Sequence, residues 1–566
     1  MKKSILLIAL ICIASLGLLL TSCRADEEDD RGLELTLTED ETAYVVTGLG
    51  ACTDTDIVIP SQHLEKPVVA IGEKAFYLRS RITSVTIPDS ITEIEASAFA
   101  YCENLIAVTM GDGVTAIGKS AFSDCTALSS VTFGEGLRYI RQNAFESCVS
   151  LTSVTLPAGV TSIAADAFLD CFRLIEVINL SALTVTVGEE NHGRVACYAA
   201  EVHTGESRLE TDGAFVFYPV DGVYALVTYT GSDTDVILPA AYQGAPYAIR
   251  PHAFFGYKKL TSVVIPEGVT EIGESAFQGC AGLSEVTVPD SVARMGKSSF
   301  EGCSRLNRLS IPFVGECRNR EDRGYIGYIF GANGAHSNED RVPGSLKTVI
   351  VRGACALAPN AFLGCRGMET VVLENVTRIG AGAFERCRNL TEIVLSDKLT
   401  AIDDGAFSSC QKLTSVVIPA GVSEIGGTAF FDCSALTSVV MGEGISRIGD
   451  YAFFNCYSLV EAHLPESLTE IGDYAFADCI KLTSISFADG LISIGDSAFT
   501  NCHGLTTVTI PMSVTSLGVD SFTYCENLTD IYYPGSMEQW YGIVQGMIIV
   551  PGWQPTVVHY HSTPTP

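Results

Sequence analysis

A phenylalanine that recurs every 23 residues constrains this chain more than any other feature of its sequence. The recurrence runs in three blocks and contains a single spacing of 22. Chance does not hold sixteen residues in phase, so the chain is a repeat protein whose units bury their apolar sides against one another. The positions are Phe76, Phe99, Phe122, Phe145, Phe168, Phe254, Phe277, Phe300, Phe362, Phe384, Phe407, Phe430, Phe453, Phe476, Phe499 and Phe522.

Each unit predicts a short strand followed by a turn and a return to the core. In the copy that begins at Leu413, the apolar residues at unit positions 0, 3 and 5 predict a short strand that turns them toward the core. Pro419 and Gly421 then predict a turn. Val422 and Ile425 bring the chain back against the core, and the Ala-Phe pair that follows predicts a helical or 3₁₀ corner.

The repeat resembles the BspA-like, or treponemal-type, leucine-rich repeats of bacterial surface proteins. The resemblance covers about residues 40 to 535 and rests on the pattern LTSVxIPxGVxxIGxxAFxxC. It implies an α/β solenoid, a right-handed superhelix of 23-residue repeats with one long parallel β-sheet. Members of the family are associated with adhesion to host matrix proteins and with cell–cell contact, and the resemblance implies no particular ligand.

The first 34 residues predict export and anchoring. Residues 1–22 have the short positive start and apolar run of a signal peptide, and no other stretch is long and apolar enough to span a membrane. Leu20-Thr21-Ser22-Cys23 resembles the lipobox of bacterial lipoproteins, in which Cys23 is lipidated; the alternative is an ordinary signal peptide with an incidental cysteine. Residues 23–34 are an acidic tether, and Asp26–Asp30 also resembles a tag for the outer cell surface. We therefore predict a lipid-anchored protein of the bacterial cell envelope, exposed on the outer membrane.

Two interruptions of the repeat predict the domain boundaries. In the gap between Phe168 and Phe254, Ser232–Pro239 echoes Thr53–Pro60, so the solenoid starts twice. We predict a first block over 35–211 with an N-terminal cap and a second over 212–535 with its own cap. Residues 536–566 are predicted to close the core and form a tail.

The second interruption is predicted to be an insertion near 313–345. It contains polar, glycine-containing loops, with three arginines within residues 318–323 and three aromatic residues within 325–330, and loops on a rigid scaffold are frequent binding sites. We expect the aromatic residues to supply an exposed surface; the alternative is a tolerated insertion without a role. The candidate binding residues are Arg318, Arg320, Arg323, Tyr325, Tyr328 and Phe330.

Fourteen cysteines follow the repeat phenylalanine by three residues and are predicted to form a structural ladder. We interpret them as small buried side chains that donate weakly to the backbone. They are Cys102, Cys125, Cys148, Cys171, Cys280, Cys303, Cys365, Cys387, Cys410, Cys433, Cys456, Cys479, Cys502 and Cys525. Pairing along the ladder would distort the sheet, so the better disulfide candidates are Cys52, Cys197, Cys317 and Cys355. No cysteine or histidine spacing predicts a zinc site.

Charge and motif content exclude several classes of function. The net charge of −31 opposes contact with phosphate backbones, so we expect no nucleic-acid partner. No recognisable catalytic or nucleotide-binding motif is present, and we expect no catalysis, no cofactor and no metal. One alternative is calcium at Asp450, Asp473 and Asp496, because these carboxylates share one offset in successive repeats.

The predicted strand faces then decide among functions. Their outward positions are rich in serine and threonine, which suits broad protein contact or carbohydrate hydrogen bonding. We predict a non-catalytic adhesin or protein-binding scaffold whose partner is another protein or a cell-surface macromolecule. The alternatives are a glycan-binding lipoprotein for nutrient capture and a structural envelope component without a ligand. The oligomeric state stays open.

Overall fold

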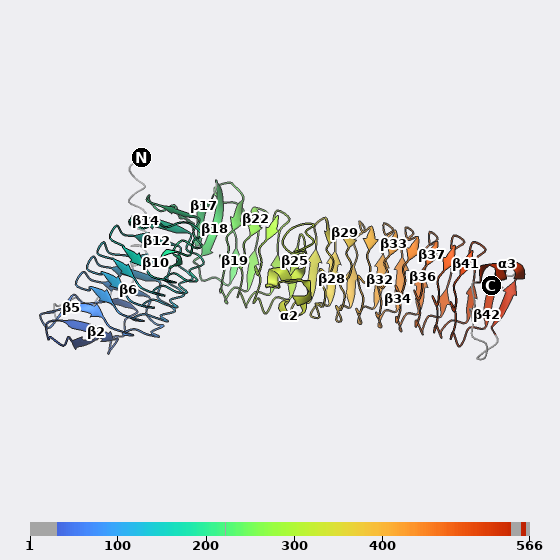
Figure 1. The fold of residues 1–566 in the computed structure, drawn as a ribbon, viewed down its shortest axis with the longest axis horizontal. Coiled ribbons are helices and arrows are strands. Elements are labelled where there is room, and N and C mark those ends of the chain that lie inside the picture. Colours follow the sequence, from blue (N-terminus) through green and yellow to red (C-terminus); the bar gives the residue numbers. More distant parts are fainter. Residues whose placement is uncertain (1–30, 221, 545–555, 562–566) are drawn as a thin grey trace. The chain divides into compact units, whose positions relative to one another are not determined.

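The computed structural model describes residues 31–220, 222–544 and 556–561 and confirms the predicted repeat solenoid. The chain divides into two compact units, Met1–Arg208 and Leu209–Pro566, which are described separately. In each unit the repeats appear as successive turns whose strands pair in parallel (Figure 1). The signal segment, Cys23 and Asp26–Asp30 lie outside the described residues.

Each turn of the solenoid contributes two strands, where the sequence predicted one. The Leu413 repeat, for example, forms β32 (Ser415–Ile418) and β33 (Glu424–Ile425). The longer strands pair with their counterparts 23 residues away and build what we call the major ladder; the shorter strands build the minor ladder. The second ladder exists because the residues after the proline turn also run extended beside the next coil.

In unit 1 the minor ladder begins with an antiparallel pair and then continues in parallel. Its order is β1 (Glu34–Leu37), β2 (Tyr44–Gly48), β5 (Lys66–Ile71), β7 (Glu93–Ile94), β9 (Ala116–Ile117), β11 (Tyr139–Ile140) and β13 (Ser162–Ile163), with β4 (Gln62–His63) beside β5. The major ladder contains β3 (Asp56–Val58), β6 (Ser84–Ile87), β8 (Ala107–Met110) and β10 (Ser130–Thr132), then β12 (Ser153–Leu156), β14 (Glu176–Asn179) and β15 (Glu201–His203). A short 3₁₀ turn, η1 (His192–Arg194), lies between β14 and β15.

Unit 2 also opens with antiparallel strands and then continues in parallel. Its minor ladder contains β16 (Glu210–Asp212), β17 (Phe215–Val220), β18 (Val223–Tyr229), β20 (Tyr247–Ile249), β22 (Val269–Ile272) and β24 (Arg294–Met295), then β27 (Cys355–Leu357), β29 (Val376–Ile379), β31 (Ala401–Ile402), β33, β35 (Arg447–Ile448), β37 (Glu470–Ile471), β39 (Ser493–Ile494) and β41 (Ser516–Leu517).

The major ladder of unit 2 runs beside it in three paired segments. The first contains β19 (Asp235–Ile237), β21 (Ser262–Val264), β23 (Glu285–Thr287), β25 (Arg308–Ile311), β26 (Thr348–Val351), β28 (Thr370–Leu373) and β30 (Glu392–Val394). The second contains β32, β34 (Ser438–Met441), β36 (Glu461–His463) and β38 (Ser484–Ile485). The third contains β40 (Thr507–Thr509), β42 (Asp530–Tyr533) and β43 (Val557–Tyr560).

The corner that carries the repeat phenylalanine is a run of turns, so the prediction of a helical or 3₁₀ corner is wrong. Thr428 and Asp432, on either side of Phe430, both have a positive φ, of 53° and 54°. Left-handed residues cannot continue a right-handed helix. Alternate N–H groups of the corner donate to the next coil, as Phe430 does to the carbonyl of Ala452 at 2.7 Å, and those between donate within the corner, as Phe431 does to Thr428 at 3.1 Å.

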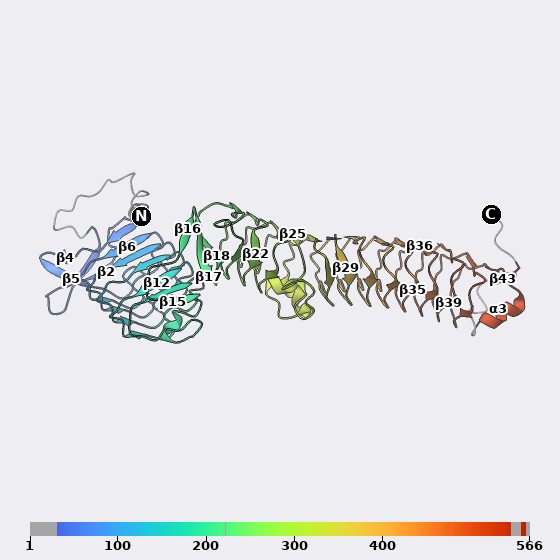
Figure 2. The same ribbon diagram turned by 90° about the horizontal axis from the view of Figure 1, so that it is seen from above.

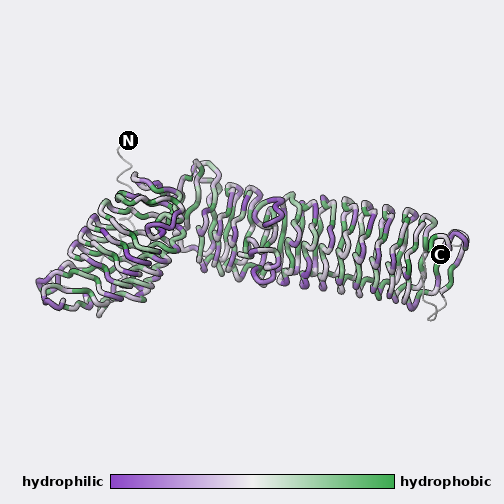
Figure 3. Tube along the Cα trace, viewed as in Figure 1, coloured by the Kyte–Doolittle hydropathy of each residue, from purple (hydrophilic) through white to green (hydrophobic). Residues whose placement is uncertain are grey.

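The repeat phenylalanines stack on one another inside the solenoid. Adjacent rings lie 4.8 to 5.4 Å apart between centroids. Their planes are nearly parallel, and rings such as Phe430 and Phe453 are fully buried. Along the backbone, hydropathy alternates on a short period, which reflects this repeated turning of apolar residues inward (Figure 3). Each unit therefore has one continuous hydrophobic core. In unit 2 the phenylalanine column within that core is interrupted between Phe300 and Phe362.

The ladder cysteines join each coil to the one before it. The Sγ of Cys433 donates to the carbonyl oxygen of Phe407, in the preceding coil, at 3.2 Å. Thirteen of the fourteen make this bond, and Cys365, the first after the insertion, is the exception among the hydrogen bonds found. All 18 described cysteines are free thiols, so Cys52, Cys197, Cys317 and Cys355 form no disulfide here.

The end of unit 2 is closed by the helix α3 (Met537–Ile543) and by β43, which pairs in parallel with β42. The helix starts at a capping box formed by Ser536 and Gln539. Trp540 is buried and packs against Tyr533, with 5.4 Å between ring centroids. The second tryptophan, Trp553, lies outside the described residues.

We predict that Phe430→Ala lowers the free energy of unfolding by about 3–5 kcal/mol, because it removes one ring from a closely packed column. Urea unfolding followed by circular dichroism measures this. The control is Tyr457→Ala, whose side chain is 39% exposed and outside the column, with an expected cost below about 1 kcal/mol. Equal costs for the two variants would contradict the central role of the column.

We predict that the ladder cysteines are almost inert in the folded chain. Burial raises the pKa of Cys102, Cys387 and Cys525 to about 12, which keeps the thiols protonated at neutral pH. Because the thiolate is the nucleophile, their reaction with a disulfide reagent at pH 8 should slow about a thousandfold relative to the denatured chain. Cys197 and Cys317, which are partly exposed, should react first. Fast labelling of the ladder in native protein would disprove this.

Candidate binding surfaces

The predicted insertion occupies one coil of unit 2. It leaves the solenoid after β25 and returns at β26, and these two strands remain directly paired in the major ladder. Its short helices η2 (Ile326–Phe330), η3 (Ala335–Ser337) and α2 (Asn338–Arg341) stand out from one side of the unit (Figure 2). The insertion thus enlarges a corner of the coil without interrupting the major ladder.

A buried carboxylate fixes the first loop of the insertion. The side chain of Glu316 is only 4% exposed and lies 3.1 Å from Arg294 and 3.2 Å from Arg323. Arg320 approaches the same carboxylate at 3.4 Å. A buried charge requires such partners to offset its lost hydration. Two of the predicted binding arginines therefore anchor the loop to β24.

The remaining arginine contacts are also internal to the chain. Arg320 forms a second ion pair with Asp322, whose hydrogen bond raises the pKa of Arg320 and is matched by a lowered pKa of Asp322. Arg318 donates to the carbonyl oxygen of Pro312 at 3.2 Å and lies over the ring of Phe313. All three guanidinium groups nevertheless keep part of their surface exposed to solvent.

The expectation of an exposed aromatic surface in the insertion is wrong. Tyr325 is 7% exposed, Tyr328 is 6% exposed and Phe330 is 1% exposed. The helix η2 replaces a corner of the regular repeat, and the backbone of Phe300 donates to the carbonyl of Ile329 as it would to a normal coil. The aromatic side chains consequently fill the core between the coils of Phe300 and Phe362. A sequence cannot separate an aromatic residue that fills a gap from one that faces a partner.

A small hollow of about 240 Å³ lies beside the arginine loop. Asn319–Glu321 form one wall, and the segment from Ala356 to Pro359 forms another. Arg378 and Asp403 complete it and are paired with each other at 2.9 Å. Three of its four charged side chains are already in ion pairs, which leaves only Glu321 without one among the described residues.

The outward face of the major ladder is only partly as predicted. The serines and threonines expected there are exposed or half-buried; they are Ser84, Thr86, Ser130, Thr132, Ser153, Thr155, Ser484, Ser486, Thr507 and Thr509. In unit 2, however, the same columns also carry exposed aliphatic side chains that the prediction missed. Val394 is 46% exposed, Val417 is 64% exposed and Val440 is 43% exposed. The missed signal was valine at a position that the strand period assigns to solvent.

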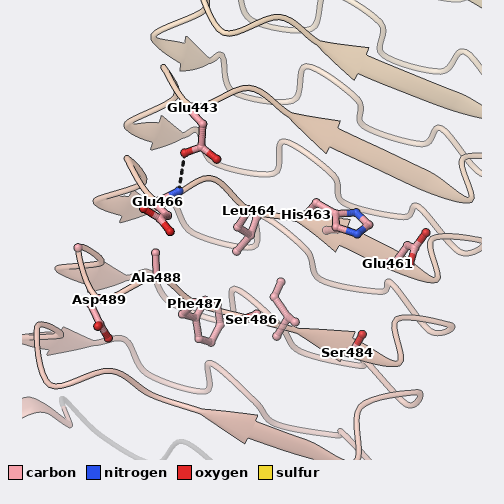
Figure 4. A pocket seen from close by; sticks show the side chains of 13 residues that line it. Glu443, Glu461, His463, Leu464, Glu466, Ser484, Ser486, Phe487, Ala488 and Asp489 are labelled. Carbon is pink, nitrogen blue, oxygen red and sulfur yellow. Dashed lines mark hydrogen bonds between the residues drawn. The ribbon is translucent and has the colours of Figure 1, made fainter.

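An open hollow of about 860 Å³ adjoins this valine column (Figure 4). The strands β36 and β38 and the turns that follow them form it. His463 and Glu461 point from β36, and Ser484 and Ser486 continue the same columns in the next coil. Glu443, Glu466 and Asp489 line the turn side, one from each of three coils. Among the described residues that line it, no lysine or arginine balances these carboxylates.

The aspartate column considered for calcium has a structural partner in the backbone. Asp450 accepts the N–H of Asp473 at 3.0 Å, and Asp473 accepts that of Asp496 at 2.7 Å. The carboxylates thus bind the first amide of the next corner. Within the described ranges, no group of three or more histidine, cysteine, aspartate or glutamate side chains is arranged to hold a metal ion.

A partly exposed aromatic cluster lies at the corners of three adjacent coils and was not predicted. Tyr451 and Tyr474 stack at 4.8 Å between centroids, and Phe431 and Phe454 stack at 5.4 Å. The two pairs meet edge to face between Tyr451 and Phe454.

The described part of the chain contains no helix with the length and hydrophobicity of a membrane span.

The stacked coils and the two strand ladders define a leucine-rich-repeat solenoid. The family described as the BspA type leucine rich repeat region matches residues 52–188, 240–318, 356–479 and 446–542, in six copies. These ranges cover more than half of the chain, and the chain belongs to this family. It is therefore a repeat protein of a kind that serves as a protein-binding scaffold and is typically non-catalytic.

Comparison with solved structures finds other leucine-rich-repeat proteins. A leucine-rich repeat protein from Bacteroides ovatus is 20% identical, with a TM-score of 0.29, and the match covers 91% of this chain and 98% of that one. A leucine rich cell surface protein from Faecalibacterium prausnitzii is 23% identical, with a TM-score of 0.25 and coverage of 91% and 97%. The T. pallidum leucine rich repeat protein is 24% identical, with a TM-score of 0.20 and coverage of 50% and 91%. No curated protein matches the chain.

We predict that Glu316→Gln loosens the first loop of the insertion, because it removes the charge that three arginines share. Trypsin cleavage after Arg320 and Arg323 should accelerate at least about tenfold, the equivalent of losing one charged hydrogen bond. The control is Asp340→Asn, an exposed carboxylate in the other half of the insertion. Unchanged cleavage in Glu316→Gln would show that the buried carboxylate does not hold the loop.

Proposed function

We propose that this protein is a lipid-anchored adhesin or protein-binding scaffold on the bacterial cell surface. Its partner is another protein, of a host matrix or of a neighbouring cell. The observation that carries the proposal is the exposed face of the major ladder in unit 2, where aliphatic, hydroxyl and charged side chains alternate on a rigid surface. A mixed surface of this kind is typical of non-obligate protein interfaces.

Protein contact is favoured over the alternative of glycan capture. Sugars stack on the open faces of aromatic rings, whereas in the cluster at the corners of unit 2 the rings stack on each other. Tyr451 and Tyr474 therefore each cover one ring face of the other. The valine column adds apolar area, which a protein partner buries more readily than a sugar does.

The anchor and the location rest on the first 34 residues. An apolar run ends at Leu20-Thr21-Ser22-Cys23, and an acidic segment follows. We place the lipid on Cys23 and the repeats outside the outer membrane, with residues 23–34 as the tether. In the same proposal, residues 35–211 and 212–535 are two repeat blocks, each with its own cap, and no cofactor takes part.

We predict that protease added to intact cells releases peptides of the 23-residue repeats while a periplasmic marker stays intact. Cys23→Ser should move the protein from the membrane fraction to the soluble fraction, because no lipid can be attached to serine. The matched control is Cys12→Ser, which leaves the lipobox unchanged. Repeats that stay protected until the outer membrane is opened would contradict the surface location and with it the adhesin.

A further inference from the structure

The valine column and the acidic hollow form one continuous surface on the major ladder. Val417 pairs in register with Val440, and Val440 pairs with His463. The column therefore runs from aliphatic side chains on β32 and β34 directly to the imidazole at the edge of the hollow. At its other end the column extends to Val394 in β30, which belongs to the preceding coil and lies beside β32.

Most of the polar side chains on this surface have no partner among the described residues. No described residue forms an ion pair or hydrogen bond with the side chain of Glu461, His463 or Asp489. Glu443 uses one carboxylate oxygen to accept the N–H of Glu466 at 2.9 Å, and the carboxylate of Glu466 is free. Elsewhere on the same ladder charges are paired, as between Glu285 and Arg308 at 3.1 Å.

Two properties of this surface thus coincide at one place. Val394, Val417 and Val440 expose apolar area to water. Four carboxylates line the hollow, and no lysine or arginine among its described lining residues neutralises their charge. Apolar contact gives affinity, and complementary charge gives orientation and rate of encounter. A partner that satisfies both must present aliphatic and cationic groups within a short distance of each other.

We propose that this surface, formed by β30, β32, β34, β36 and β38, binds an extended protein segment in which a run of aliphatic residues adjoins a run of lysine or arginine residues. The aliphatic side chains pack on Val394, Val417 and Val440. The cationic side chains enter the hollow toward Glu461, Glu466 and Asp489. Ser484 and Ser486 supply hydroxyl groups for hydrogen bonds at the far edge. The inference rests on the proposed protein-binding function and names the partner's chemistry and the place where it binds.

The test uses the full chain and a short fluorescent peptide in which a run of valines adjoins a run of lysines, with binding measured by anisotropy. A peptide with glutamate in place of lysine and one with serine in place of valine serve as probes of charge and of apolar contact. We expect measurable binding of the valine-lysine peptide alone, weakened by added salt. Equal binding of all three peptides overturns the inference.

Two double variants then locate the site. Val417→Ser with Val440→Ser removes the apolar contact, and Glu461→Gln with Asp489→Asn removes two charges from the hollow. Each pair should weaken binding about tenfold, since each removes part of the recognition while leaving the buried core unchanged. Circular dichroism of the variants verifies that the solenoid is intact.

Matched controls separate this site from the general acidity of the chain. Val264→Ser changes another exposed valine of the same ladder, and Glu103→Gln with Glu135→Gln removes two exposed charges from unit 1. These variants should bind the peptide as the parent does. If they weaken binding as much as the site variants do, the attraction is diffuse and the inference fails. Failure of the peptide test does not affect the proposal that the protein is exposed on the cell surface. Repeats that are protected from protease in intact cells would overturn the proposed function without affecting the proposed peptide site.

Discussion

Every coil of this protein depends on contact with the coils beside it. A 23-residue unit with two short strands cannot enclose a core, so its leucine, valine, isoleucine and phenylalanine side chains are buried only by stacking. The phenylalanine column and the cysteine bonds to the preceding coil repeat this contact along each unit. Contacts between neighbouring coils therefore replace the single closed core of a globular domain. The last coil of a unit has no neighbour on one side, so it needs a cap such as α3.

Polar groups follow the same rule of pairing between neighbours. Asp450, Asp473 and Asp496 accept backbone N–H groups from the next coil, as Glu443 does in the turn after β34. The corners with left-handed residues also direct alternate backbone N–H groups, such as that of Phe430, toward carbonyl oxygens of the next coil. Acidic side chains in a regular column are thus part of the scaffold, and only those left unpaired, such as Glu461, are available for a partner.

The insertion shows how a binding prediction and a packing role are confused in sequence. Arginines and tyrosines in a polar loop have the composition of an interface, yet Tyr328 fills the core and Arg323 neutralises a buried glutamate. Both residue types are common in interfaces because they combine apolar area with polar ends. That same combination makes them suitable for closing the irregular gap that an enlarged coil leaves.

The sequence by itself determined the solenoid, the positions of the phenylalanine and cysteine columns and the place of the insertion, because stacking demands the same residue at the same offset in every coil. It did not determine which of the irregular residues face solvent. The burial of Tyr325 and of Val417 is the opposite of what their sequence neighbours suggest. Tyr325 lies in a polar loop but is buried, and Val417 lies in an apolar strand but is exposed. Only the tertiary structure decided this, since burial outside the repeat depends on which neighbouring coil covers each side chain.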